Sequence, residues 1–172
     1  MEKLFNVIPE CYIDTNLIEF LLNAKVNHQH SCNNVIKALN DKKDEFAIGI
    51  IDNDKRKVAY INDCKEIIKT KHLTLFKHRA RNQYLITISP AADRFILNIA
   101  KEQGVDISNF ELSINFKDFL KETKTITSNK DQRFKKLFKE IKNHEEISLL
   151  QEVLTYLCEN KYQSDVEEIK KF

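Results

Sequence analysis

Glycine and proline are scarce in this chain of 172 residues, which contains two of each. So few turn-forming residues favour a helix-rich fold. The two glycines, Gly49 and Gly104, lie far apart, so the sequence has no glycine-rich phosphate-binding loop. This absence argues against a nucleotide-binding ATPase and against a Rossmann-type cofactor site.

Long apolar runs and paired cysteines are also missing. The first residues carry charges at Glu2 and Lys3 and resemble no signal peptide, and no apolar run approaches the length that spans a membrane. The four cysteines form no C-x-x-C pair, which is typical of reduced thiols. We therefore expect a cytoplasmic protein that has no membrane partner.

Charge of one sign does not dominate either. Lys and Arg total 28 and Asp and Glu total 26, so the formal net charge of +2 creates no basic field of the kind that alone implies nucleic acid. Any binding of DNA or RNA must then be local. An apolar content of 42% excludes wholesale disorder, and the length suits one domain with an extension.

Strand and helix patterns alternate through the first hundred residues. A short strand, two helices and a buried apolar strand are followed by two strands with a basic connector and by a helix that begins at Ser89-Pro90 and ends at Gly104. The predicted ranges are a strand over 4–12, a helix over 15–24, a helix capped by Ser31 or Asn33, a strand over 46–51, a short helix over 62–68, and strands over 73–76 and 84–88. This order predicts an α/β fold with a small, mainly parallel sheet flanked by helices.

The pattern changes after Gly104. Apolar residues at helical spacing, including Phe116, Phe119, Phe134 and Phe138, predict three amphipathic helices. Aromatic residues at this spacing more often form a core than a stacking platform. We therefore divide the chain into an α/β domain over 1–104 and a helical C-terminal extension over 105–172, packed on the domain or beside it.

Carboxylates follow two of the predicted strands. Glu10 and Asp14 lie at the end of the first strand, and Asp52 and Asp54 follow the buried strand over 46–51. Ligands bind beyond the carboxyl ends of strands in open α/β sheets, and clustered carboxylate oxygens suit Mg²⁺ or Mn²⁺. Because Asp-Asn-Asp is also a good turn sequence, a purely structural role stays open.

Two segments resemble the signatures of the Toprim family. The segment VIPECYIDTNLIEFLL is similar to its strand, glutamate, aspartate and helix, and FAIGIIDNDKR to its apolar strand that ends in Asp-x-Asp. The resemblance covers about the first hundred residues and implies Mg²⁺-dependent phosphoryl transfer, as in topoisomerases, primases and nucleases of the overcoming-lysogenization-defect type. It implies that Glu10 is the general acid/base, Asp14 the aspartate at the helix start, and Asp52 and Asp54 the metal-binding pair. Cys11 follows the glutamate, where Toprim domains usually have glycine.

Basic residues occur near the acidic strand end and in the later connector. Cations beside a metal site hold phosphate and stabilise charge in a transition state. We expect Lys55 to act in catalysis, and we expect phosphate contacts from a further set, although runs of charge between strands are often only solvated loops. That set is Arg56, Lys77, His78, Arg79 and Arg81.

The motif His28-x-His30-x-Cys32 offers two interpretations. We expect His28 and His30 to contact substrate. Zinc binding is the less favoured alternative, because a structural zinc site needs four ligands and the sequence shows no second ligand pair.

Together these patterns predict Mg²⁺- or Mn²⁺-dependent hydrolysis of a phosphodiester in DNA or RNA. The alternative is a catalytically silent interaction module of the same fold, which would partner an ATPase or a nucleic-acid protein. A small-molecule phosphatase is a third possibility.

Overall fold

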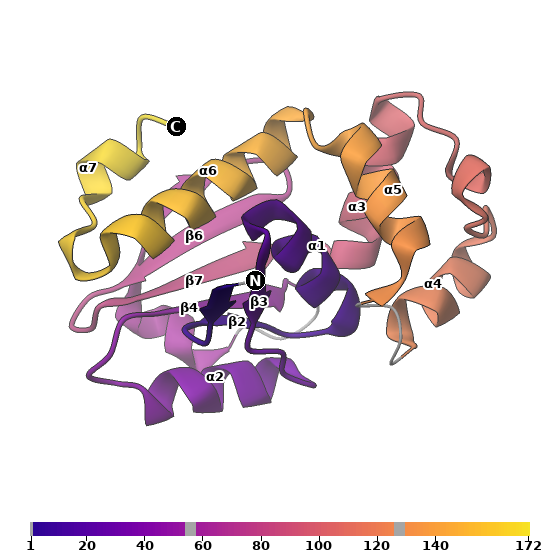
Figure 1. Ribbon diagram of the computed structural model, residues 1–172. Coiled ribbons are helices and arrows are strands. Elements are labelled where there is room, and N and C mark those ends of the chain that lie inside the picture. The colour runs from indigo at the N-terminus through magenta and orange to yellow at the C-terminus, as the bar shows by residue number, and fades with distance from the viewer. Residues whose placement is uncertain (1, 54–57, 126–129) are drawn as a thin grey trace.

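The computed structural model of the protein describes residues 2–53, 58–125 and 130–172. These residues form an α/β fold in which helices cover both faces of a five-stranded sheet (Figure 1). The order of the strands across the sheet is β2-β4-β7-β6-β5. Their bounds are Val7–Pro9 for β2, Ala47–Asp52 for β4, Cys64–Lys69 for β5, Leu73–His78 for β6 and Gln83–Ile88 for β7.

The sheet is mixed rather than mainly parallel. Strands β2, β4 and β7 pair in parallel, whereas β6 pairs antiparallel with both β7 and β5. The short connection between β6 and β7 explains this, since parallel neighbours need a long crossover. The α/β class is confirmed. The sequence left a hairpin or adjacent strands open for β6 and β7, and their antiparallel pairing makes them a hairpin.

The predicted strand over 4–12 is wrong in its extent. It is divided into β1 (Glu2–Leu4), which pairs in parallel with β3 (Ala24–Val26) in a separate small sheet, and β2. The chain after β3 continues along β2: the backbone N–H groups of Asn27 and Gln29 donate to the carbonyls of Val7 and Pro9, each at 2.9 Å. The edge of the main sheet at β2 is therefore covered by the segment that carries the histidines.

Alternate residues of β4 face two different helical layers. Ala47 and Ile51 pack with α2 (Cys32–Asp41), and Ile48 and Ile50 belong to the core on the other face. That second core is covered by α1 (Tyr12–Leu22) and α6 (Glu145–Asn160) (Figure 1). Both predicted N-terminal helices and the buried strand are thus confirmed, with ends shifted by one to three residues.

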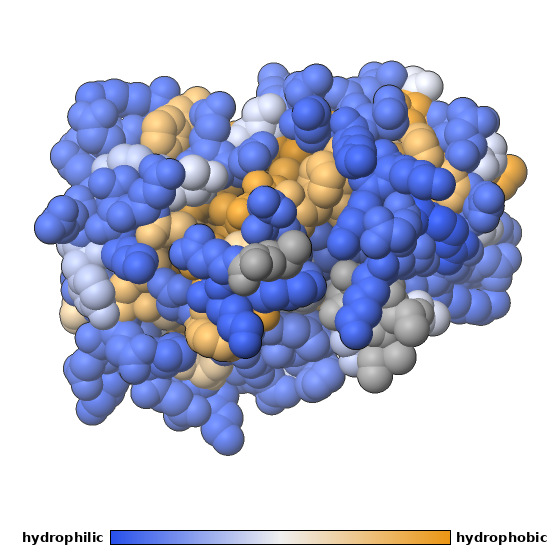
Figure 2. All heavy atoms as spheres, in the orientation of Figure 1, coloured by the Kyte–Doolittle hydropathy of each residue, from blue (hydrophilic) through white to orange (hydrophobic). Residues whose placement is uncertain are grey.

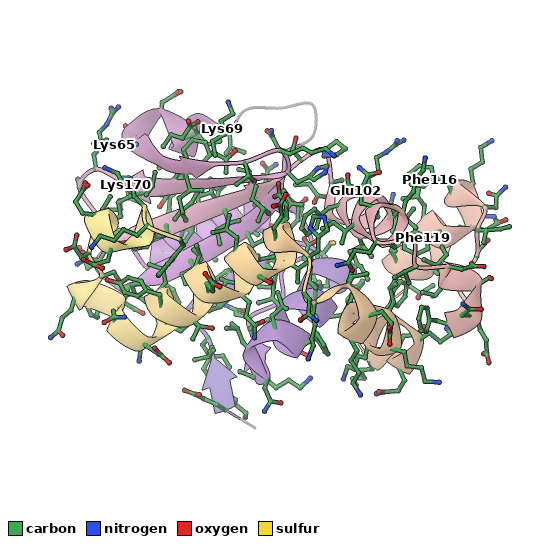
Figure 3. All side chains as sticks on the ribbon, turned by 90° about the horizontal axis from the view of Figure 1, so that it is seen from above. Lys65, Lys69, Glu102, Phe116, Phe119 and Lys170 are labelled. Atoms are coloured by element: carbon green, nitrogen blue, oxygen red, sulfur yellow. The ribbon has the colours of Figure 1, made fainter. Side chains whose placement is uncertain are left out.

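The helical extension packs on the sheet domain. Its amphipathic helices are α4 (Phe116–Lys124), α5 (Gln132–Ile141) and α6, followed by the short α7 (Val166–Ile169), and their buried residues join one hydrophobic cluster with residues of the first hundred. Phe119, Phe134 and Phe138 are fully buried, as the core interpretation predicted. Figure 3 shows Phe116 and Phe119 at one end of the molecule and Lys65 and Lys69 of β5 toward the other.

The predicted helix over 62–68 is wrong. A 3-10 helix (Ala59–Asp63) ends there, and β5 begins at Cys64. The β-branched pair Ile67 and Ile68 suits a strand, and pairing with β6 outweighs the weak helical pattern. Helix α3 (Ala92–Glu102) begins two residues after Pro90 and ends just before Gly104, whose φ of 67° lies in the left-handed region.

Hydrophilic residues cover most of the face seen in Figure 2, and apolar atoms show between them in the middle of the view. Among the described residues, four large apolar side chains are exposed at separate places in the sequence: Phe5, Ile114, Tyr162 and Phe172. No helix within the described residues is long and apolar enough to cross a membrane.

Gly49 allows α2 to approach β4 closely. A Cβ atom at this position would lie 2.8 Å from Leu39 Cδ1 and 3.0 Å from a carbon of both Val35 and Leu85.

We expect Gly49→Ala to lower the free energy of unfolding by about 1–3 kcal/mol through overpacking, measured by urea denaturation. In a double-mutant cycle with Leu39→Val, the double variant should lose less free energy of unfolding than the sum of the losses in the two single variants. Strict additivity, or unchanged stability in Gly49→Ala, would contradict this packing.

Candidate functional site

Parallel pairing of β2 with β4 brings two carboxylates together. Pro9 is paired with Ile50, so the residues that follow each strand emerge at the same edge of the sheet. Here the backbone N–H of Asp52 donates to Glu10 Oε2 at 3.1 Å. The predicted proximity of Glu10 and Asp52 is therefore confirmed.

Asp52 also connects the sheet to the start of α3. Its Oδ1 accepts from the backbone N–H of Ala92, the first residue of that helix, at 2.9 Å. The next N–H along the chain, that of Asn53, donates to Ile88 O at 2.8 Å. A carboxylate at a helix N-terminus interacts favourably with the helix dipole, which helps to hold Asp52 at this edge.

Asp14 lies buried behind these two carboxylates. It is in the first turn of α1, where Oδ2 accepts from Cys11 N–H at 3.2 Å, and its side chain is 0% exposed. Its other oxygen, Oδ1, is buried and has no hydrogen-bond partner among residues 2–53, 58–125 and 130–172. Burial raises the pKa of Asp14 well above its usual range, and the nearby charges of Asp52 and Glu10 raise it further. Three carboxylates thus share one region of the protein.

Cys11 occupies a position that does not need glycine. Its φ of −126° and ψ of 176° are extended backbone, which any residue adopts. Burial raises the pKa of its thiol, and so does the adjacent Asp14 carboxylate. Cys11 therefore stays a neutral thiol at neutral pH and is a poor nucleophile.

His28 reaches the same region from the segment along β2. Its ring stacks on Tyr12 with centroids 4.4 Å apart, and Nδ1 lies 2.8 Å from Thr15 Oγ1. The exposed His30 ring stands edge-on at 4.8 Å. Burial lowers the pKa of His28, and the positive charge of a protonated His30 lowers it further. His28 is therefore neutral at neutral pH.

These groups border a pocket of about 370 Å³. Its lining joins the ends of β2 and β4, the starts of α1 and α3, the histidine segment and the end of α4. The lining residues are Glu10, Cys11, Tyr12, Ile13, His28, His30, Asp52, Asp93, Thr123 and Lys124.

The site list drawn from the sequence lacks several of these residues. Asp52 is the last residue of β4, and Asp93 lies in the first turn of α3, the helix that follows β7, so the rule of strand carboxyl ends also points to Asp93. Tyr12 could have been noted as the residue that opens α1. Thr123 and Lys124 belong to the extension, and no local signal ties them to the pocket.

Some predicted metal ligands and cations are not placed. Asp54, Lys55 and Arg56 lie outside the described residues. Over 2–53, 58–125 and 130–172, no three His, Cys, Asp or Glu side chains are grouped closely enough to hold a metal ion together. The same holds for His28, His30 and Cys32, which are not grouped closely enough to hold zinc together.

The basic connector lies at the opposite end of the sheet from the acidic pocket (Figure 1). Gln83, which follows it, pairs with Ala47, and five residue steps of about 3.3 Å separate Ala47 from Asp52, or roughly 17 Å. The structure therefore does not bring Lys77, His78, Arg79 and Arg81 to the carboxylates.

Contacts within the hairpin region occupy these basic side chains. Lys77 Nζ donates to the carbonyls of His78 and Arg81, and His78 Nδ1 accepts from Ala80 N–H. Arg79 donates to Asn62 O at 3.4 Å and Arg81 to Asn40 Oδ1 at 2.8 Å. His78 and Arg81 also line a separate open cleft of about 740 Å³.

We expect Asp14→Asn to stabilise the metal-free protein at neutral pH by about 1–3 kcal/mol, the typical cost of an unsatisfied buried group. Because the pKa of Asp14 is raised in the folded protein, the wild type loses stability as the pH rises through that pKa. The difference in stability between Asp14→Asn and the wild type should therefore become smaller as the pH is lowered. Thermal unfolding at several pH values measures this.

Asp118→Asn is the matched control for this change. Asp118 is in the same position of the first turn of α4 but exposed, and its substitution should cost a few tenths of a kcal/mol. Destabilisation of Asp14→Asn at neutral pH would show that the buried carboxylate is not under strain.

We expect His28 to titrate below pH 6.5 and His30→Asn to raise the midpoint without restoring the ordinary value. The substitution removes a neighbouring positive charge, whereas burial, the larger cause, remains. An NMR pH titration of the His28 ring measures both midpoints. An unchanged midpoint in the variant would show that the two rings are not electrostatically coupled.

Comparison with known proteins adds no assignment to this geometry. The pocket must therefore be interpreted from the chemistry of its own side chains. No protein-family model, curated protein or solved structure matches the chain.

Proposed function

We propose that the pocket hydrolyses phosphodiester bonds of DNA or RNA with the help of Mg²⁺ or Mn²⁺, as a Toprim-like domain would. The observation that carries this proposal is the convergence of Glu10 and Asp52 at adjacent strand ends, in front of the buried Asp14. Oxygen ligands gathered at a sheet edge are the donors that these cations prefer.

The donor set suits a cation. Among the described residues, Asp14 Oδ1 is buried without a hydrogen-bond partner, and the charges of Glu10 and Asp52 lie nearby. A positive charge would relieve both costs. Glu10 and Asp52 would hold the ion, with Asp14 behind them. Because the described residues supply no group of three ligands, Asp54 is the candidate for the further ligand. The bound ion would polarise the phosphoryl group and neutralise its charge.

The protein's own groups hold this arrangement in place. Asp52 N–H anchors Glu10, and Ala92 N–H anchors Asp52, so each carboxylate is tied to the backbone of a neighbouring element. This suits Glu10 to holding a cation more than to the proton transfer that the family resemblance implies. Lys124 at the pocket supplies a positive charge for a phosphate oxygen, which the distant hairpin cannot.

The second candidate is a catalytically silent module that partners an ATPase or a nucleic-acid protein. Two observations favour it: the described residues alone form no three-ligand group, and the basic hairpin is occupied by structural contacts. The acidic pocket would then serve only to join β2, β4 and α3.

Cleavage assays separate these two functions. We expect labelled single-stranded DNA, duplex DNA or RNA to be cut with Mg²⁺ or Mn²⁺ and not with a chelator. Glu10→Gln and Asp52→Asn should each lower the rate at least about 100-fold, since a cation site loses a charged ligand. Both variants keep an acceptor for the N–H that they bind. Asp41→Asn, at the exposed end of α2, is the control and should cut at the wild-type rate.

A thermal shift with Mn²⁺ completes the test. Stabilisation of the wild type that is lost in Asp52→Asn supports the metal site. Absence of both cleavage and stabilisation would refute the hydrolase and favour the silent module. Cleavage of small phosphate esters alone would move the substrate class to small molecules.

A further inference from the structure

We propose that helices α4 and α5 of the extension form a surface that binds a polynucleotide and guides its phosphate backbone to the acidic pocket. The inference builds on the proposed action on DNA or RNA, because it names the surface that holds the polymer outside the pocket. It starts from the uneven distribution of charge along the chain.

Positive charge is concentrated in one segment. Residues 116–142, which contain α4, α5 and their connection, include nine Lys or Arg and four Asp or Glu, so their formal net charge is +5. Because the whole chain has a net charge of +2, the other residues together have a net charge of −3. The small overall charge therefore hides a local basic region. A protein without a global basic field needs such a region to bind a polyanion.

The lysines of α4 lie on its exposed side. Lys117, Lys121 and Lys124 follow one another at spacings of four and three residues, so they share one face of the helix, and all three are exposed. The buried Phe119 and Thr123 lie on the opposite face. The three lysines extend over about 10 Å of the helix, and Lys124 lines the acidic pocket. The row of lysines therefore ends where the proposed chemistry takes place.

Helix α5 continues the basic surface beside α4. The two helices are in contact through the rings of Phe119 and Phe134, whose centroids are 5.8 Å apart, and both pack on α1 (Figure 1). The apolar residues of α5 are buried, whereas Lys136 and Lys139 are exposed on the opposite side of the helix. Because both helices turn their buried sides toward the core, their lysines lie on the outer surface.

Ion pairs within the protein use few of these cations. Asp118 pairs with Lys121 at 2.7 Å, and Glu122 and Asp131 both pair with Arg133. Two cations thus satisfy three of the four acidic residues of the segment. The exposed lysines that form no ion pair among residues 2–53, 58–125 and 130–172 include Lys117, Lys124, Lys136 and Lys139. Their charges are available to an anion outside the protein.

The chemistry of this surface favours a polynucleotide over a membrane. A basic amphipathic helix binds lipid by inserting its apolar face, but here that face is in the core, since Phe119, Phe134 and Phe138 are fully buried. A phosphate backbone requires only the cations, because binding releases its counterions. The carboxylates of the pocket repel the same backbone, so cations outside the pocket are needed to offset that repulsion.

Binding of labelled single-stranded DNA or RNA, followed by fluorescence anisotropy with a chelator present, tests the surface apart from cleavage. The triple variant Lys117→Gln, Lys136→Gln, Lys139→Gln changes exposed residues outside the pocket. It should bind at least about 10-fold more weakly at low salt. The slope of log affinity against log salt should become shallower by about 0.7 for each phosphate contact that is lost.

A matched control removes three exposed lysines toward the other end of the molecule. Lys65→Gln, Lys69→Gln and Lys170→Gln change the net charge by the same amount and should leave the affinity unchanged (Figure 3). A gain of affinity provides a second test that misfolding cannot imitate. Glu140→Gln removes an exposed carboxylate from α5 and should tighten binding about twofold, since one repulsive charge is lost.

The outcomes distinguish this surface from the proposed function. Wild-type affinity in the first triple variant, or an equal loss in both triple variants, would overturn the surface while leaving the hydrolase intact. So would binding of anionic phospholipid vesicles in place of oligonucleotides. If the wild type binds oligonucleotides through these lysines but cuts none, the surface is supported, and the hydrolase is refuted in favour of the silent module.

Discussion

The parallel pairing of β2 with β4 is the constraint on which the pocket depends. It places the residues after both strands at one edge of the sheet, where Asp52 N–H donates to Glu10 Oε2 at 3.1 Å. The same edge receives the start of α3, because Ala92 N–H donates to Asp52 Oδ1. A backbone ladder thus fixes two carboxylates whose mutual repulsion would otherwise keep them apart.

Burial of Asp14 is the costliest feature of this edge of the sheet. A carboxylate that is 0% exposed, has one oxygen with no partner among the described residues and lies near two like charges opposes folding. Stability is often lower at functional sites, where groups are held for chemistry rather than for packing. His28 and His72 each have a buried ring nitrogen with no partner among the described residues, so this cost is not confined to the pocket. By contrast, the buried Gln83 uses its whole amide: Nε2 donates to Leu39 O and Lys42 O, and Oε1 accepts from Tyr60 OH.

The two ends of the sheet have different properties. At one end, the carboxylates of Glu10 and Asp52 border a pocket; at the other, the cations of the β6–β7 hairpin are engaged with backbone carbonyls and an asparagine. Among the residues that the structure describes, the cation that lines the acidic pocket, Lys124, comes from the helical extension. The extension therefore contributes to the pocket as well as to the core, and the sequence boundary near Gly104 does not separate two functional units.

The sequence by itself determined the elements whose pattern is local. The apolar run over 46–51 allows little but a buried strand, and Ser31 marks the start of α2 by capping its first turn. The rule that ligands bind at the carboxyl ends of strands then singled out Glu10 and Asp52, which would be neighbours if their two strands paired. Tertiary structure decided what depends on pairing partners and on direction. Antiparallel pairing of β7 with β6 carried the basic residues to the far end, and packing of α4 brought Lys124 to the pocket. The ladder along β2 placed His28 against Thr15, 13 residues away in sequence. Sequence periodicity records which face of an element is buried but not which distant element covers it, so these arrangements had no local signal.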